Sequence, residues 1–121
     1  MEKKNVILDK SLEFALDIIE YSELLEEHKK YVIARQILKS GTSIGANIRE
    51  AQSSESRADF IHKLKIAAKE ALETEYWLML CNQSSSYPSN HLQPKKLEEI
   101  QKLFSSIISS AKRNSINTSK Q

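Results

Sequence analysis

Apolar residues recur along this chain at steps of three and four, the spacing that places them on one face of an α-helix. Four segments show this period, at about residues 8–27, 29–53, 56–81 and 94–112. Ser56 is a candidate N-cap for the third segment, and Pro94 fits the first turn of the fourth. We therefore expect one all-α domain over residues 1–113, an antiparallel up-down-up-down four-helix bundle, followed by a disordered tail at 114–121.

The same period predicts which side chains form the core of the bundle. In residues 8–27 the leading stripe is Leu8, Leu12, Ala15 and Ile19, widened by Ile7, Phe14, Ile18, Tyr21 and Leu25. The second segment contributes Ile33, Ile37, Gly41, Ile44, Ile48 and Ala51, and the third contributes Phe60, Leu64, Ala67, Ala71, Thr74 and Leu78. The fourth contributes Leu97, Ile100, Phe104, Ile107 and Ala111.

Both glycines of the chain, Gly41 and Gly45, lie inside the second segment, in SGTSIGANIREA (40–51). A phosphate-binding loop would need a G-x-x-x-x-G-K-[ST] pattern after a strand, and this stretch has neither. The helical period continues through both glycines, although each lowers helix propensity by about 1 kcal/mol relative to alanine. We expect the pair to permit close packing of a neighbouring helix. A kink between two shorter helices is the alternative interpretation.

A small, polar stripe lies beside the apolar stripe of the second segment. It consists of Gln36, Ser40, Ser43, Asn47, Glu50 and Ser54. On the third segment Glu75 falls within the apolar arc and Glu73 lies at its edge, where a carboxylate needs a hydrogen-bond donor. We predict a buried polar seam or subunit contact that includes Ser43, Asn47, Glu50, Glu73 and Glu75. An ordinary boundary between core and solvent would give the same pattern.

The net charge of +2 indicates no strong preference for nucleic acid, so the placement of charges matters more. Arg35, Lys39 and Arg49 point nearly opposite the predicted core on the second segment. They are candidate contacts to the phosphates of a nucleic acid, although a charged outer face is usually only solvated.

The remaining composition narrows the chemistry. The single cysteine, Cys81, excludes an internal disulfide and fits a reducing compartment. The charged N-terminus is unlike a signal peptide, and no apolar run reaches the roughly 20 residues that span a bilayer. We expect a cytoplasmic protein that contacts no membrane. The three histidines lack the paired E-x-x-H motifs of a di-metal bundle, so no metal or other cofactor is expected.

One short pattern leaves an enzymatic alternative open. Arg57 and His62 form R-x-x-x-x-H, which resembles the catalytic motif of the HEPN ribonucleases. Residues five apart on one helix point about 140° from each other, so the two would converge only if the helix began between them or a dimer joined them.

The glycine stretch and ESRADFIHKLKIAAKEALETEYWL (55–78) together resemble the 23S rRNA-intervening sequence proteins of bacteria. The shared pattern is S-[IV]-x-x-N-I-x-E, then D-F with a leucine four residues on, then I-A and an acidic segment. Its residues here are Ser43, Ile44, Asn47, Ile48, Glu50, Asp59, Phe60, Leu64, Ile66, Ala67, Glu73 and Glu75. The resemblance extends over about residues 5–110.

This resemblance implies an up-down bundle that assembles as a ring-like homopentamer. Some members are encoded within insertions in large-subunit ribosomal RNA genes. The related accessory variability determinant proteins of diversity-generating retroelements are basic and bind RNA and a reverse transcriptase. The present chain is nearly neutral, and the resemblance assigns no catalytic residue.

We therefore expect a non-enzymatic, oligomeric helical bundle that acts as an interaction protein, with RNA or an RNA-associated protein as partner. The first alternative is a purely structural or protein-binding oligomer. The second is a HEPN-like ribonuclease that uses Arg57 and His62.

Overall fold

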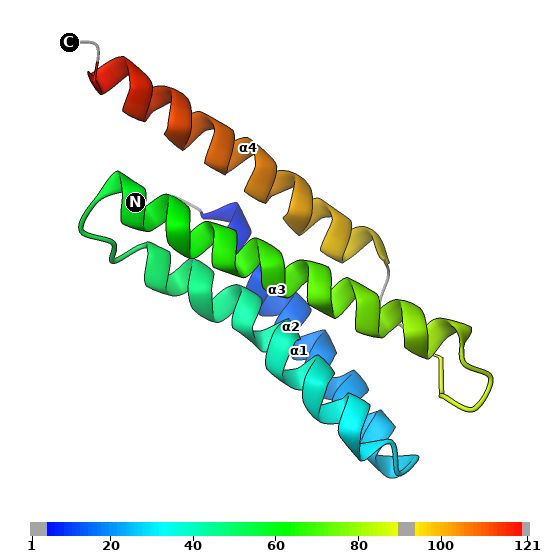
Figure 1. The fold of residues 1–121 in the computed structure, drawn as a ribbon. Coiled ribbons are helices and arrows are strands. Elements are labelled where there is room, and N and C mark those ends of the chain that lie inside the picture. Colours follow the sequence, from blue (N-terminus) through cyan, green and yellow to red (C-terminus); the bar gives the residue numbers. More distant parts are fainter. Residues whose placement is uncertain (1–4, 90–93, 120–121) are drawn as a thin grey trace.

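The computed structural model describes residues 5–89 and 94–119, and the side chains of 5–89 and 94–114. Over these ranges the chain forms four α-helices and no strand: α1 (Val6–Glu27), α2 (Tyr31–Ala51), α3 (Arg57–Gln83) and α4 (Pro94–Ser119). The all-α prediction is thus confirmed. Figure 1 shows α1, α2 and α3 side by side, and α4 packs against α1 and α3.

The helix ends follow from local sequence. The side chain of Asn5 caps α1 by accepting from the backbone N–H of Leu8, and Ser56 caps α3 by accepting from that of Asp59. Between α1 and α2, Lys29 has a positive φ of 62°, and Lys30 N–H donates to the Leu25 carbonyl at 2.8 Å. This pattern closes α1 with a Schellman motif, which explains a turn of only three residues between two long helices.

Most of the core lies where the sequence pattern placed it on α2 and α3, although Ile33 and Phe60 are only partly buried. The prediction for α1 was wrong in its centre. Leu12 and Ile19 are exposed, and the buried face is centred on Ile7, Phe14 and Ile18, which were predicted to lie beside the leading stripe. The buried face also includes two serines, Ser11 and Ser22. These small polar residues interrupt the apolar period on the true core face, so the outer apolar residues gave a more regular stripe.

Gly41 and Gly45 lie within a continuous α2 and face α1. A Cβ atom on Gly41 would lie 2.8 Å from both Cγ1 and Cγ2 of Ile18, closer than carbon atoms normally approach. A Cβ on Gly45 would lie 3.4 Å from Ser11 Oγ, an ordinary contact. The helix does not break at the glycines, and Gly41 allows the backbone of α2 to approach Ile18 closely.

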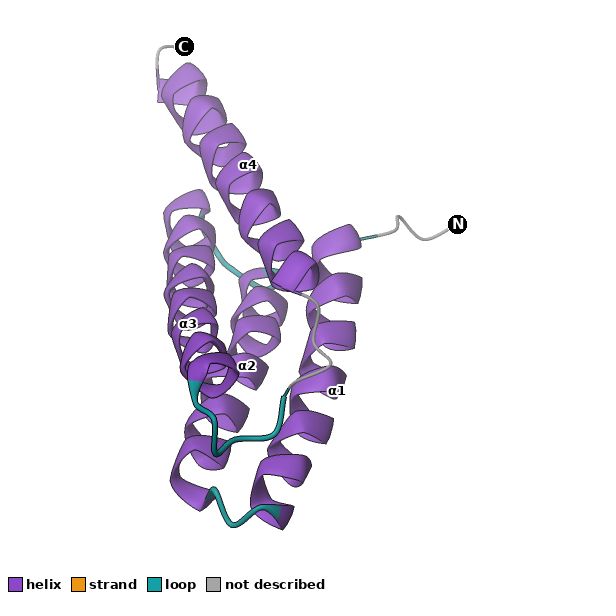
Figure 2. Cartoon of the chain, turned by 90° about the vertical axis from the view of Figure 1, so that its right-hand side faces the viewer, coloured by secondary structure: helices purple, strands orange, loops and turns teal. Residues whose placement is uncertain are grey.

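The fourth helix packs against the rest of the bundle along only part of its length. Leu97, Ile100 and Phe104 are buried, whereas Ile107 and Ala111, also predicted as core, are only partly buried. The C-terminal end of α4 projects past the other three helices (Figure 2). The helix continues to Ser119, so residues 114–119 of the expected disordered tail are helical, while 120–121 lie outside the described residues. None of the described helices is long and apolar enough to cross a membrane.

Candidate functional site

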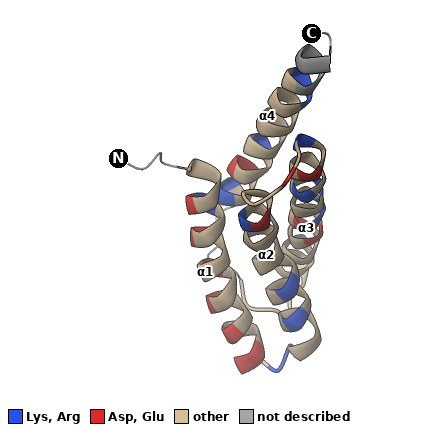
Figure 3. Ribbon diagram, turned by 90° about the vertical axis from the view of Figure 1, so that its left-hand side faces the viewer, with Lys and Arg blue, Asp and Glu red and all other residues tan. Residues whose placement is uncertain are grey.

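The outer face of α2 presents the three basic residues singled out in the sequence. Arg35, Lys39 and Arg49 are all exposed. Arg35 and Lys39 are one turn apart, and Arg49 lies about 15 Å farther along the helix axis than Lys39. Within the described residues none of the three forms an ion pair. Figure 3 shows Lys and Arg positions on α2 and a row of Asp and Glu positions along α1.

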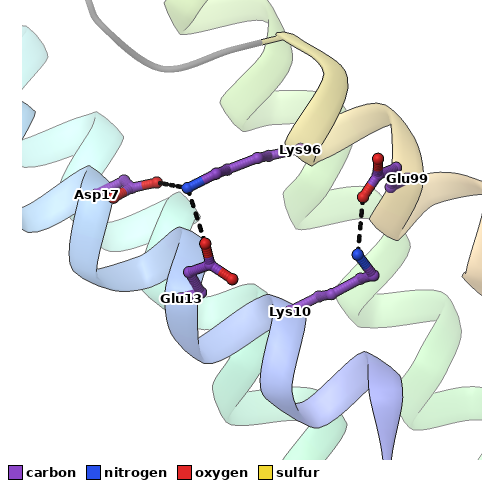
Figure 4. A network of polar contacts seen from close by, with 5 residues as sticks. All are labelled: Lys10, Glu13, Asp17, Lys96 and Glu99. Carbon is purple, nitrogen blue, oxygen red and sulfur yellow. Dashed lines mark hydrogen bonds and ion pairs between the residues drawn. The ribbon is translucent and has the colours of Figure 1, made fainter.

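Other lysines are occupied in contacts within the chain. Lys96 Nζ on α4 donates to Asp17 Oδ2 at 2.7 Å and lies 3.0 Å from Glu13 Oε1 on α1. Lys10 Nζ on α1 donates to Glu99 Oε2 on α4 at 2.8 Å (Figure 4). These crossed pairs fasten the first half of α4 to α1.

The pKa values of the paired groups reflect these contacts. The hydrogen bond and the positive charge of Lys10 hold the pKa of Glu99 below its ordinary value. Hydrogen bonds to Asp17 and Glu13 raise the pKa of Lys96, and the hydrogen bond to Glu99 raises that of Lys10. Each shift favours the charged form of its group. The network therefore serves to position α4, and sequence reasoning did not anticipate it because it joins residues about 80 to 90 positions apart.

The polar stripe of α2 divides into a buried and an outer part. Ser40 and Thr74 are fully buried, and Thr74 Oγ1 donates to Ser40 Oγ at 2.8 Å across α2 and α3. Ser43 and Asn47 are partly buried and hydrogen-bond to carbonyl oxygens of their own helix. The buried polar contact between these helices thus involves Ser40 and Thr74, a pair that the sequence analysis placed in two separate stripes.

The three acidic residues assigned to the seam do not lie together. Glu50 is exposed, and its Oε1 lies 3.9 Å from Lys63 Nζ of α3, whereas Glu73 is exposed and forms no ion pair within the described residues. Glu75 was expected within the apolar arc, but it is exposed and lies at the other edge of α3, where it lines a groove with α4. Since it is in water in the single chain, its carboxylate needs no donor from Asn47.

The groove beside Glu75 has a volume of about 530 Å³ and runs between α3 and α4. Its lining is Ala68, Leu72, Glu75, Gln101, Phe104, Ser105, Ile108 and Ser109. A second groove, of about 650 Å³, lies between the α2–α3 turn and the distal part of α4, and Arg57 lines it.

Within the described residues the geometry brings together neither Arg57 and His62 nor the ligands of a metal site. His62 does not line the groove that contains Arg57, and both residues are exposed on the first turns of α3. Because α3 begins at Arg57 itself, the helix places the two side chains on different faces. In the described part of the chain no three His, Cys, Asp or Glu residues form a group that could hold a metal ion. Cys81 is buried, and this burial raises the pKa of its thiol, which disfavours the reactive thiolate.

Comparison with known proteins agrees with the helical architecture. The chain is similar to a crystal structure from Bacteroides thetaiotaomicron, described as a protein with unknown function from the S23 ribosomal protein family. The two share 50% sequence identity with a TM-score of 0.75, over 87% of this chain and 96% of that chain. No curated protein matches. Residues 3–110 match the family described as 23S rRNA-intervening sequence protein, and the chain belongs to that family.

Proposed function

We propose that this chain is a non-enzymatic interaction protein that self-associates into a ring-like oligomer, a pentamer by family resemblance, and binds RNA or an RNA-associated protein in the cytoplasm. Its unit is an up-down-up-down bundle, supported by the contacts of Gly41 with Ile18 and of Gly45 with Ser11, which run in opposite directions along α1 and α2. The observation that supports a polyanionic partner is the unpaired basic face of α2.

The charges of Arg35, Lys39 and Arg49 are accessible, since no acidic side chain within the described residues pairs with them. A single copy offers only three such charges, spread over about 21 Å of helix, so its affinity for a phosphate backbone is low. A ring repeats the face around an axis and multiplies weak contacts through effective concentration. The proposal therefore links RNA binding to self-association.

Catalysis by Arg57 and His62 is not expected, because the two residues do not converge on a common groove within one chain. Incubation of the protein with structured RNA checks this point. Intact RNA is expected, whereas cleavage that disappears in His62→Ala would establish the ribonuclease alternative instead.

The binding experiment titrates structured RNA at low and moderate salt against the parent and Arg35→Glu/Lys39→Glu/Arg49→Glu. Affinity of the parent should fall steeply with salt, because each phosphate contact releases counterions. The triple variant should bind more weakly, and its slope of log affinity against log salt should be lower by about 2 to 3 for each copy whose basic face contacts the RNA.

A matched control changes three exposed lysines of α4, as Lys95→Glu/Lys102→Glu/Lys112→Glu, which alters the net charge by the same amount. Equal loss in both triple variants would mean that only net charge matters. Absence of binding even at low salt would refute the RNA proposal and leave the structural or protein-binding oligomer.

A further inference from the structure

Two apolar stripes lie on the outside of the bundle, away from the core. The stripe on α1 consists of Leu12, Leu16 and Ile19, with exposed fractions of 54%, 56% and 38%. The stripe on α3 consists of Leu72, Tyr76 and Met79, with exposed fractions of 60%, 55% and 49%. Each stripe has steps of four and three residues, so each forms a continuous ridge two turns long. Apolar side chains clustered in this way on a soluble surface mark an interaction site.

The stripes differ in shape. The α3 stripe borders the groove between α3 and α4, which Leu72, Phe104 and Ile108 line. The α1 stripe lines neither of the two grooves described above, and its exposed side chains form a ridge. A ridge on one helix and a groove beside another are the two parts that helix packing requires.

Contacts inside the bundle place the two stripes at the same height. Ile18 on α1 faces Gly41 on α2, and the next residue to Gly41, Ser40, bonds to Thr74 on α3. Ile18 and Thr74 therefore lie at one level along the bundle axis, to within about one helical turn, or 5 Å. Leu16 and Leu72 each lie two residues earlier, so they too share a level.

The two helices also run in the same direction. From Ser11 to Ile18 the contacts on α2 move from Gly45 back to Gly41. From Glu50 back to Ser40 the contacts on α3 move from Lys63 to Thr74. A second copy placed beside the first, with a parallel bundle axis and no shift along that axis, would thus bring Leu16 of one copy to the level of Leu72 of the other.

Charge favours the same register. Asp9 lies seven residues before Leu16, and Lys65 lies seven residues before Leu72, so these two charges would share a level near the apolar contact. Both are exposed, and within the described residues neither forms an ion pair. An anionic and a cationic group at matching positions make another copy of this chain a fitting occupant of the groove.

We propose that the α1 ridge of one copy docks along α3 and the α3–α4 groove of the next copy, with Leu16 against Leu72. This inference rests on the proposed self-association and names its surfaces. The contact is heterologous, because ridge and groove are different faces of the chain. Its register has no shift along the bundle axis, so repetition can close a ring and does not climb into a filament.

The test uses Leu16→Lys and Leu72→Lys, two changes at exposed positions, with mass measured by light scattering at micromolar concentration. Each variant should be monomeric, because a lysine placed between the two apolar stripes would lose its hydration. Mixed in equal amounts, they should form a dimer with one copy of each, since the intact ridge of one variant fits the intact groove of the other. The unused ridge and the unused groove of that dimer both carry the introduced lysine, so no further copy should bind to them.

Glu73→Lys serves as the control, because Glu73 is exposed and does not line the groove. It should assemble like the parent. If Glu73→Lys is monomeric while both leucine variants assemble, the polar seam predicted from the sequence is the contact and this inference is overturned. A monomeric parent would instead overturn the proposed self-association itself.

A covalent variant keeps the inference testable if either lysine variant misfolds, as judged by circular dichroism. Leu16→Cys/Leu72→Cys, oxidised with diamide, should give a ladder of disulfide-linked multimers, because facing residues at one level can meet the short distance that a disulfide needs. Leu16→Cys/Glu73→Cys should give none. A ladder from the second pair alone would refute the register, and Cys81 is buried and should not contribute.

Discussion

Replacement of Gly41 by alanine tests the closest helix contact in the protein. Alanine raises helix propensity by about 1 kcal/mol over glycine, so an open position would be stabilised. At Gly41 the added Cβ would lie 2.8 Å from two branch carbons of Ile18, and these carbons are attached directly to the Cβ of a fully buried residue. Ile18 cannot turn away from the contact without displacing its own neighbours in the core.

The size of the effect follows from these two opposing terms. Overpacking of a well-packed core costs about 1–3 kcal/mol, and subtraction of the propensity gain leaves a net destabilisation of about 1 kcal/mol for Gly41→Ala. Gly45 is the matched control, because its added Cβ would make only an ordinary contact with Ser11 at 3.4 Å. Gly45→Ala should therefore stabilise the protein by up to about 1 kcal/mol. Gly41→Leu should be more destabilising than Gly41→Ala.

The assay is thermal unfolding followed by circular dichroism at one fixed protein concentration, since self-association makes the melting temperature concentration-dependent. A difference of about 2 kcal/mol corresponds to melting temperatures separated by roughly 8 °C for a domain of this size. A double-mutant cycle with Ile18→Ala should show favourable coupling, because removal of the two branch carbons relieves the clash. If Gly41→Ala melts at or above Gly45→Ala, the close approach does not limit packing and the reasoning is wrong.

Two further predictions concern polar contacts. Thr74→Val should destabilise the protein by about 1–3 kcal/mol in urea unfolding, because Ser40 loses its buried hydrogen-bond partner. The double variant Ser40→Ala/Thr74→Val should recover part of this loss. A double variant no more stable than Thr74→Val would contradict this account. Glu99→Gln should lower the melting temperature at neutral pH. Because Lys10 lowers the pKa of Glu99, the contribution of the pair is fully present above the ordinary value of 4.5 and is lost as the pH falls through the lowered pKa. The difference between parent and Glu99→Gln should shrink over that acidic range, and a constant difference would show that the charge of Glu99 does not stabilise the fold.

The sequence by itself determined the helices and most of the core. Steps of three and four between apolar residues, together with caps such as Ser56, depend only on local geometry, so they predicted α2 and α3 closely. The same local information placed Arg35, Lys39 and Arg49 on an outer face, where they are exposed.

Tertiary structure decided what local periodicity leaves open. On α1 two apolar stripes compete, and only the packing against α2, where Ser11 meets Gly45 and Ile18 meets Gly41, selects the buried one. The lysine contacts that fasten α4 to α1, and the hydrogen bond of Ser40 with Thr74, join residues far apart in the chain. Likewise Glu75 is exposed because α4 leaves a groove along that edge of α3. A helical pattern fixes the angle of a side chain around its own axis, but only the placement of neighbouring helices decides whether that angle meets protein or water.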